Sequence, residues 1–263
     1  MTTEDIITHI FCDVDEKLNG TSKAPGERLW PSEVVTIGIL FALKGGHFRA
    51  FYRWLKRDFA CLFGKDGEPF RTTVARQMRA YQHYTDVFLS QPTVLNVVDS
   101  YPIELIFPIR EGRSKQQYGR KSKDKGRWTV GVKRCWVLNQ VGHGCAWIWD
   151  PLNRPDQDFL PFLAEYDEEA IILADWGFRW AEGLPDNVKL CKKGTWHDRM
   201  MVETSFSLLT VVCQAKKIFH RAEAYIETRL AYTVAMFNVC LALFHRLHPD
   251  QPPFKMSIAE FSL

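Results

Sequence analysis

The sequence lacks several patterns that would assign it to a common class at once. Its seven cysteines are odd in number, scattered and without a C-x-x-C pair, which disfavours a zinc finger and a disulfide framework. It has no glycine-rich nucleotide loop, no nucleophile elbow and no catalytic pair of histidine and cysteine. Internal repeats and low-complexity tracts are missing as well. A typical small-molecule enzyme is therefore disfavoured.

Long apolar runs and a targeting segment are also missing. No uninterrupted apolar stretch reaches the ~18 residues of a membrane span. The opening residues, Met1 to Asp5, are acidic rather than arranged as a signal peptide. We therefore expect a cytoplasmic protein with reduced, mostly buried thiols and no membrane partner. With 263 residues, 46% of them hydrophobic, the chain can bury the core of one large domain or two modest ones.

The positive charge is concentrated in one segment. The formal net charge is only +3, yet ten Lys or Arg residues and two acids lie between positions 110 and 134. Such a block is typical of a surface that binds a polyanion, although a solvated loop would look the same in sequence. We expect a loop from Arg110 to Arg127 that tracks phosphates through Arg110, Arg113, Lys115, Arg120, Lys121, Lys123, Lys125 and Arg127.

The first ninety residues have the pattern of several short helices. Ser32 precedes an apolar run that stops at Gly45, which predicts a capped start and a glycine stop. Apolar side chains then recur at spacings of three and four from Phe48 to Leu62, with basic residues on the other face. We expect an all-helical N-terminal domain over 1–90. Basic helix faces suit a domain that binds DNA ends, but a plain helical packing domain remains the alternative.

The pattern changes after Gln91-Pro92. We expect strands at 94–99, 129–138, 145–149, 170–174 and 188–191, with helices at 157–166, 196–213 and 222–247. This order predicts an α/β fold, an RNase H-like mixed β-sheet with flanking helices, over 91–248. Residues 249–263 are expected to form a tail.

Three acidic residues stand at telling places in this pattern. Asp99 and Asp175 each close an apolar run that predicts a strand, and Glu203 lies in a segment with helical periodicity. In an RNase H-like layout the two strands end side by side and the helix packs across them. Three carboxylates in one cleft bind hard divalent cations through oxygen, so we expect Asp99, Asp175 and Glu203 to form a metal-dependent catalytic site.

Three segments resemble the DDE-type insertion-sequence transposases, most closely the insertion sequence 982 family. They are Asp99 to Leu105 followed by Arg110, Ala174 to Phe178, and Arg199 to Ser207. The resemblance implies Mg²⁺-dependent cleavage at transposon ends and transfer of the freed 3′-hydroxyl into target DNA. It also implies two Mg²⁺ ions, replaceable by Mn²⁺, bridged by Asp99 and held by the other two acids. The expected partners are double-stranded DNA, carrying the terminal inverted repeats or the target, and a second copy in a homodimer. Such a protein is nucleoid-associated when bound to DNA.

Some positions depart from the family pattern. A related signature of tyrosine, arginine, glutamate and lysine has tyrosine where this chain has Trp196, and lysine where it has Thr210. Relatives also often carry lysine where this chain has Trp176. Lys216 and Lys217 follow later and could substitute in part. These departures concern the grip on DNA and leave the three acids unchanged.

Several assignments stay open at this stage. Arg199 fits either a phosphate contact or a salt bridge on a helix face. Trp176 and Trp196 fit either stacking on a displaced base or core packing. Asp150, Asp156 and Asp158 fit loop and helix-capping roles better than that of a fourth metal ligand, although one of them could be such a ligand. An RNase H-like nuclease without strand transfer and an inactive, transposase-derived DNA-binding protein are the alternative functions.

Overall fold

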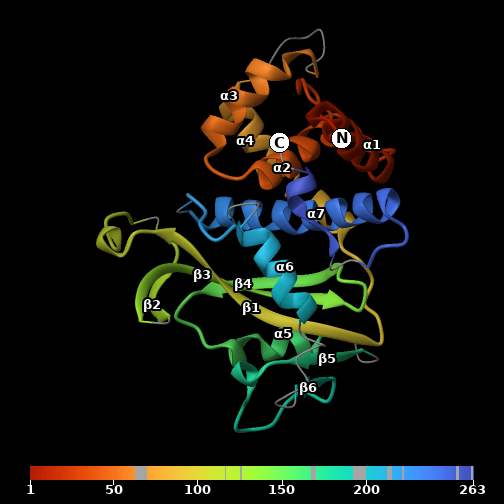
Figure 1. The fold of residues 1–263 in the computed structure, drawn as a ribbon. Helices are drawn as coiled ribbons and strands as arrows, with labels where there is room; N and C mark the ends of the chain where they lie inside the picture. Colours follow the sequence, from red (N-terminus) through yellow and green to blue (C-terminus); the bar gives the residue numbers. More distant parts are fainter. Residues whose placement is uncertain are drawn as a thin grey trace.

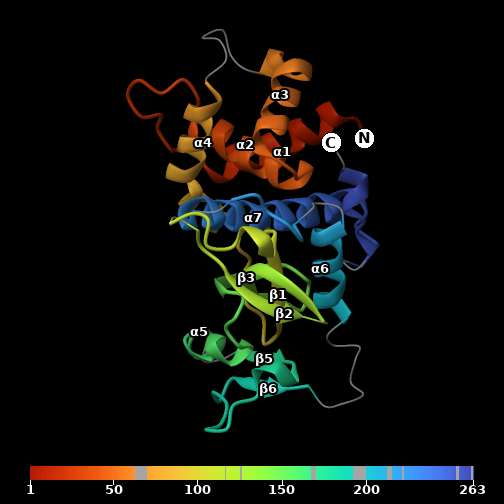
Figure 2. The same cartoon turned by 90° about the vertical axis from the view of Figure 1, so that its left-hand side faces the viewer.

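The protein has a mixed α/β fold in which helices flank an open mixed sheet (Figure 1). The computed structural model describes residues 1–62, 70–115, 117–124, 126–166, 170–191, 200–211, 215–220, 222–252, 255–261 and 263. The long helix α7 (Glu223–Leu247) lies between a layer of N-terminal helices and the sheet (Figures 1 and 2). The shorter helix α5 (Leu160–Ala164) lies beyond the sheet from that layer.

The sheet contains six strands within the described ranges. They are β1 (Leu95–Ile106), β2 (Arg120–Asp124), β3 (Arg127–Asn139), β4 (Gly144–Pro151), β5 (Ile171–Ala174) and β6 (Val188–Leu190). The order is β2-β3-β1-β5-β6, and β4 also pairs with β3. Strand β3 is antiparallel to β1, β2 and β4, whereas β5 is parallel to β1 and β6. A parallel pair therefore lies beside an antiparallel group, with β1 between them.

The first strand is longer than its sequence pattern predicts. We expected it to end at Asp99, but β1 continues through Pro102 to Ile106. The amide and carbonyl of Glu104 bond Lys216 and Ile218 on the edge away from β3. The backbone N–H groups of every second residue point to the same edge of a strand. The nitrogen of Pro102, which carries no hydrogen, therefore lies on the same edge as the Glu104 amide, beyond the end of β5. The proline therefore removes no hydrogen bond to β3.

The basic segment is not a simple loop. We expected a loop from Arg110 to Arg127, and this was wrong for Arg120–Asp124, which forms strand β2. This strand pairs with the start of β3 in a tight hairpin, in which Asp124 lies opposite Arg127 and Gly126 adopts a φ of 84°. Charged side chains on an edge strand are common because they discourage pairing with other chains. The hairpin thus presents its cations on a defined scaffold.

The N-terminal ninety residues are helical in their described part. The elements are α1 (Thr3–Lys17), α2 (Pro31–Lys44), α3 (Phe48–Asp58), η1 (Ala60–Leu62), α4 (Arg71–Ala80) and η2 (Gln82–Phe88). Helix α2 begins at Pro31, whose fixed φ suits the first helical position, and ends at Gly45 with a φ of 74°. The predicted cap, Ser32, lies inside the helix and is buried, while the Glu33 carboxylate accepts from the Trp30 amide at 2.6 Å.

Helix α7 joins the helical layer to the sheet through one hydrophobic core. Its Phe237 ring meets the Trp136 ring of β3 edge to face, with centroids 5.0 Å apart. Buried Asn238 accepts from the Gly144 amide and donates to the Phe88 carbonyl, both at 2.8 Å. The boundary near residue 90 remains a prediction, since side chains from both sides of it share this core.

The apolar length of α7 would also suit a membrane span. Its most apolar 18-residue window has a mean hydropathy of 1.4, and 78% of that window is buried inside the protein. Thr228, Arg229 and Asn238 interrupt the apolar run, which is why a search for unbroken runs passes it over. Because it is buried among protein side chains, α7 has the surroundings of a core helix.

The remaining elements complete the two faces of the sheet. They are η3 (Pro108–Arg110), η4 (Asp156–Phe159), η5 (Trp176–Phe178), α6 (Met200–Val211) and η8 (Ile258–Phe261). The helix expected over 157–166 is two short pieces, η4 and α5, because Pro161 limits the helix start. Met256 and Phe261 from the expected tail are buried in the core that α7 shares with the N-terminal helices.

Candidate active site

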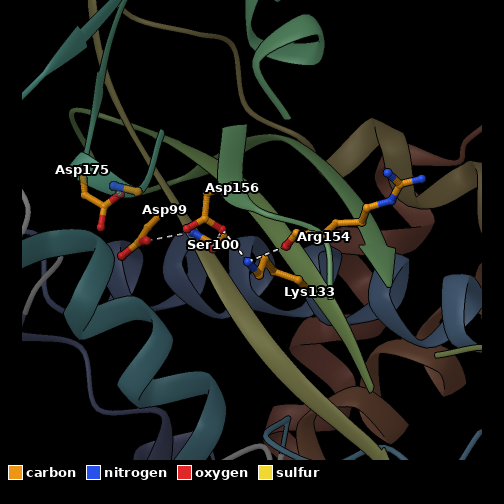
Figure 3. Close-up of polar contacts among 7 residues, drawn as sticks. Asp99, Ser100, Lys133, Arg154, Asp156 and Asp175 are labelled. Atoms are coloured by element: carbon orange, nitrogen blue, oxygen red, sulfur yellow. Dashed lines mark hydrogen bonds and ion pairs between the residues drawn. The ribbon is translucent and has the colours of Figure 1, made fainter. Parts of the chain in front are cut away.

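Asp99 and Asp175 lie together where strand β5 ends beside β1 (Figure 3). The parallel register pairs Leu95 with Ile171 and Val97 with Leu173, and two further steps in that register bring Asp99 opposite Asp175. Strand β5 stops at Ala174, whereas β1 continues. The two carboxylates therefore lie at the fork between a strand that ends and a strand that goes on.

Backbone amides orient both carboxylates. The Ser100 amide, whose edge of β1 no longer faces β5, donates to Asp99 Oδ1 at 2.7 Å. Asp175 caps η5, and its Oδ1 accepts from the Gly177 amide at 2.8 Å. One oxygen of each carboxylate is thus held by the backbone through hydrogen bonds to an ionised acceptor, which are stronger than neutral ones.

Helix α6 covers the face of the sheet that carries Asp99. Side chains alternate along a strand, so Asp99 and Tyr101 share a face. The Phe206 ring of α6 stacks on the Tyr101 ring with centroids 5.2 Å apart. Glu203 precedes Phe206 by three residues and therefore lies on the same side of the helix.

Glu203 lies near the start of α6, one helical turn before Phe206. The Glu203 side chain is exposed. Among the described residues, no three His, Cys, Asp or Glu side chains lie close enough to hold one metal ion. The structure thus brings Asp99 and Asp175 together and places Glu203 on the neighbouring helix, without a closed three-ligand set.

Asp156 belongs to the same cluster, which the sequence pattern did not reveal. Its Oδ1 accepts from Ser100 Oγ at 2.5 Å and from Lys133 Nζ at 2.8 Å (Figure 3). Lys133 also donates to the Arg154 carbonyl at 2.9 Å. Sequence reasoning missed Lys133 and Ser100, and the only signal was that Ser100 adjoins Asp99. The expected helix cap was wrong, because Pro155 precedes η4 and Asp156 lies within it.

The cluster is anionic and reaches into the sheet. Cys135 of β3 is fully buried beneath it, and burial raises the pKa of its thiol, with the Asp156 and Asp99 carboxylates adding to the rise. Tyr101 shares a face of the sheet with Asp99, opposite to the face of Cys135. Burial raises the pKa of its phenol, and a hydrogen bond with Thr210 works against the rise. The carboxylate oxygens of Asp99 and Asp175 fit a hard divalent cation, whereas the ammonium of Lys133 already compensates Asp156.

The structure describes three further side chains that we expected to contact DNA, namely Trp176, Lys217 and Lys216. Trp176 is 58% exposed, so it is not a core residue, and the Arg179 guanidinium lies 5.9 Å from its ring centroid. Lys217 pairs with Glu104 and covers the Phe107 ring at 3.6 Å. Glu104 is five residues beyond Asp99, or about 16 Å along an extended strand, so this ion pair is remote from the carboxylate fork. Lys216 is exposed beside it.

The predicted basic residues form a surface apart from the carboxylates. All of those that the structure describes are exposed: Arg110, Arg113, Lys115, Arg120, Lys121, Lys123 and Arg127. Lys121 and Lys123 lie over the half-exposed ring of Trp128, with their Nζ atoms 4.9 and 6.0 Å from its centroid. Lys125, Trp196 and Arg199 lie outside the described residues.

The fold and the cluster together define a mixed α/β protein with paired carboxylates at a strand fork and a separate cationic hairpin. No protein-family model matches this chain, and no curated protein matches it.

Proposed function

We propose that this protein is a DDE-type DNA transposase. It cleaves phosphodiester bonds at transposon ends in a Mg²⁺-dependent reaction and transfers the freed 3′-hydroxyl into target DNA. The observation that carries the proposal is that Asp99 and Asp175 each lie two residues beyond the last parallel pair of β1 and β5, with the helix that bears Glu203 packed on the Asp99 face. The resemblance of the three surrounding segments to the insertion sequence 982 family points the same way.

The arrangement of the strands supports an RNase H-like sheet. In that layout a long antiparallel group meets two short parallel strands, and the acids follow the two central strands. Here β4, β3 and β1 form the antiparallel group, and β5 and β6 form the parallel pair. Strand β2 is an addition at the β3 edge, beside β4.

The three acids supply the ligands that the reaction requires. Asp99, Asp175 and Glu203 would hold two Mg²⁺ ions, which when bound activate the attacking oxygen and stabilise the leaving oxygen of an in-line displacement. The Ser100 and Gly177 amides hold the two strand-end carboxylates in their orientation. Exposed Trp176, next to Asp175, is available to stack on a displaced base.

The cationic hairpin supplies the grip on DNA. A two-stranded ribbon fits the major groove, and its lysines and arginines neutralise phosphates. The N-terminal helices would bind the terminal inverted repeats, and a homodimer would bring two ends together, as the family resemblance implies. Such a protein acts in the cytoplasm at the nucleoid.

The test is Mg²⁺-dependent cleavage and strand transfer on DNA carrying the flanking element ends. Wild type should yield joined products, and Asp99→Asn, Asp175→Asn and Glu203→Gln should each lose about 100-fold or more, since even outer-sphere supports of metal ligands are worth 10–100-fold. Glu182→Gln, an exposed acid in the loop after η5, is the matched control and should react like wild type.

Each of the other possible results would indicate a different function for this protein or a different set of site residues. Cleavage without joining would indicate a nuclease of the same fold. DNA binding without cleavage would indicate an inactive, transposase-derived DNA-binding protein. Cleavage at the wild-type rate by Glu203→Gln would remove Glu203 from the site.

A further inference from the structure

Asp156 provides a third carboxylate, which contacts the residues that hold Asp99 and Asp175. Ser100 donates its amide to Asp99 and its hydroxyl to Asp156, so one residue links the two carboxylates. On the other side, a Cβ built at Gly177 would lie 2.6 Å from Asp156 Oδ2 and 3.0 Å from Asp175 Oδ1. Asp156 therefore approaches the backbone that orients Asp99 and the backbone that orients Asp175.

Lys133 decides which role Asp156 can take. Its ammonium forms an ion pair with Asp156 at 2.8 Å, and the side chains are only 16% and 23% exposed. Lys133 is further held by the Arg154 carbonyl, so it is fixed in place. A carboxylate that already has a cation and a hydroxyl on the same oxygen is a poor ligand for a divalent ion, because metal binding would bring two cations together.

Gly177 allows this approach. With only a hydrogen in place of Cβ, its backbone fits between Asp156 and Asp175 while its amide serves Asp175. The contact between η4 and η5 is therefore made through a carboxylate on one side and a bare backbone on the other. Asp156 is thus in close contact with the turn that holds Asp175.

We propose that Asp156 is a positioning residue. Held by Lys133, it fixes Ser100 and the Asp175–Gly177 turn, and so sets the separation of the Asp99 and Asp175 carboxylates without itself binding metal. This inference rests on the proposed metal-dependent function. It concerns the arrangement of the chain's own side chains and can therefore be measured separately.

The experiment compares Asp156→Asn with Asp156→Ala. The asparagine keeps an oxygen that accepts from Ser100 and Lys133 but loses the charge that a metal ligand needs, whereas the alanine loses both. Crystal structures of the two variants and wild type give the Asp99–Asp175 carboxylate separation. Mg²⁺ titrations of DNA cleavage give the concentration for half-maximal rate. Ser100→Ala provides a milder variant that removes only the hydroxyl link.

Positioning predicts a clear split between the variants. Asp156→Asn should keep the wild-type separation and a Mg²⁺ requirement within about 3-fold of wild type. Asp156→Ala should move the carboxylates and raise the requirement about 10-fold, as loss of an outer support does. Ser100→Ala should fall between them.

Two results would overturn the inference. An unchanged carboxylate separation in both Asp156→Ala and Ser100→Ala would show that Asp156 positions nothing. An equal, severe rise in Mg²⁺ requirement for Asp156→Asn and Asp156→Ala would make Asp156 a metal ligand. If wild type shows no Mg²⁺-dependent cleavage, the proposed function fails, and the carboxylate separations still decide the positioning role.

Discussion

Asp99 and Asp175 each lie two residues beyond the last parallel pair of β1 and β5, although 75 residues of chain separate the two acids. Hydrogen bonds between β1 and β5 hold the two strands side by side. Strand β5 ends at Ala174, so beyond that residue it no longer pairs with the edge of β1. Oxygen ligands from two distant segments can thus meet in a rigid sheet.

Gly177→Ala should impair the metal-dependent reaction with little loss of fold stability. Its new methyl group would lie 2.6 Å from Asp156 Oδ2 and 3.0 Å from Asp175 Oδ1. Asp156 cannot simply move, because Lys133 and Ser100 hold it. We expect a Mg²⁺ requirement about 10-fold higher than wild type in cleavage titrations. Adding Gly177→Ala to Asp156→Ala should have a smaller effect, and equal effects in both backgrounds would contradict the contact.

Lys121→Gln and Lys123→Gln should weaken DNA binding and its dependence on salt. Each lysine that neutralises a phosphate releases counterions, so each substitution should lower the slope of log affinity against log salt by about 1. Fluorescence anisotropy of duplex DNA at several salt concentrations measures this. Lys255→Gln, exposed near the C-terminal end, is the control. Unchanged slopes for both hairpin variants would remove β2 from the DNA-binding surface.

Two half-buried histidines, His143 and His220, should make the fold acid-sensitive. Burial lowers the pKa of His143 to about 4, with His245 nearby adding to the shift, and burial lowers that of His220 to about 4. Unfolded histidine titrates near 6.5, so between pH 4 and 6.5 the unfolded chain binds more protons and stability falls as the pH falls. The expected loss from pH 7 to 5 is about 1–2 kcal/mol per histidine.

Urea unfolding at pH 7 and pH 5 tests this acid sensitivity. His143→Gln and His220→Gln should each reduce the difference in unfolding free energy between the two conditions. His9→Gln changes an exposed histidine on α1 and should leave the difference as in wild type. If the unfolding free energy changed equally between pH 7 and pH 5 in all variants, neither His143 nor His220 would resist protonation.

Arg134→Met should leave stability unchanged or raise it. The side chain is buried, and its Nε and Nη1 find no hydrogen-bond acceptor in the part of the chain that the structure describes. Burial lowers the pKa of its guanidinium to about 10, which reflects the loss of hydration of the charge. The Trp136 ring, whose centroid lies 4.8 Å from the guanidinium carbon, gives it a cation–π contact. Replacing such a charge with an apolar side chain is often neutral or stabilising by about 1–4 kcal/mol.

Arg229→Met is the matched comparison for that prediction. Arg229 is also buried, but its Nη1 donates to the Phe41 carbonyl at 2.6 Å. Losing this bond leaves a buried carbonyl with one partner fewer, so we expect a loss of about 1–3 kcal/mol. Chemical unfolding should therefore show a loss of stability for Arg229→Met and no loss for Arg134→Met. A loss for Arg134→Met as large as that for Arg229→Met would show that the Arg134 charge is stabilised in place.

The local pattern of the sequence determined the order of the main elements and the acids that follow them. Apolar runs predicted most strands and helices after residue 90, including those that carry Asp99, Asp175 and Glu203. These signals are local, because side-chain periodicity and strand-ending residues act over a few positions. They could not reveal β2, whose lysines and arginine have no apolar alternation and form a strand only by pairing with β3.

The tertiary structure alone decided which distant residues meet. Lys133 lies opposite Pro102 on β1, and only the sheet register and the return of the chain at η4 bring it to Asp156. Likewise, packing against α7 places the N-terminal helices in the core that they share with the sheet. Such contacts depend on strand pairing and the burial of apolar surface across the whole chain, and neither is written in a short stretch of sequence.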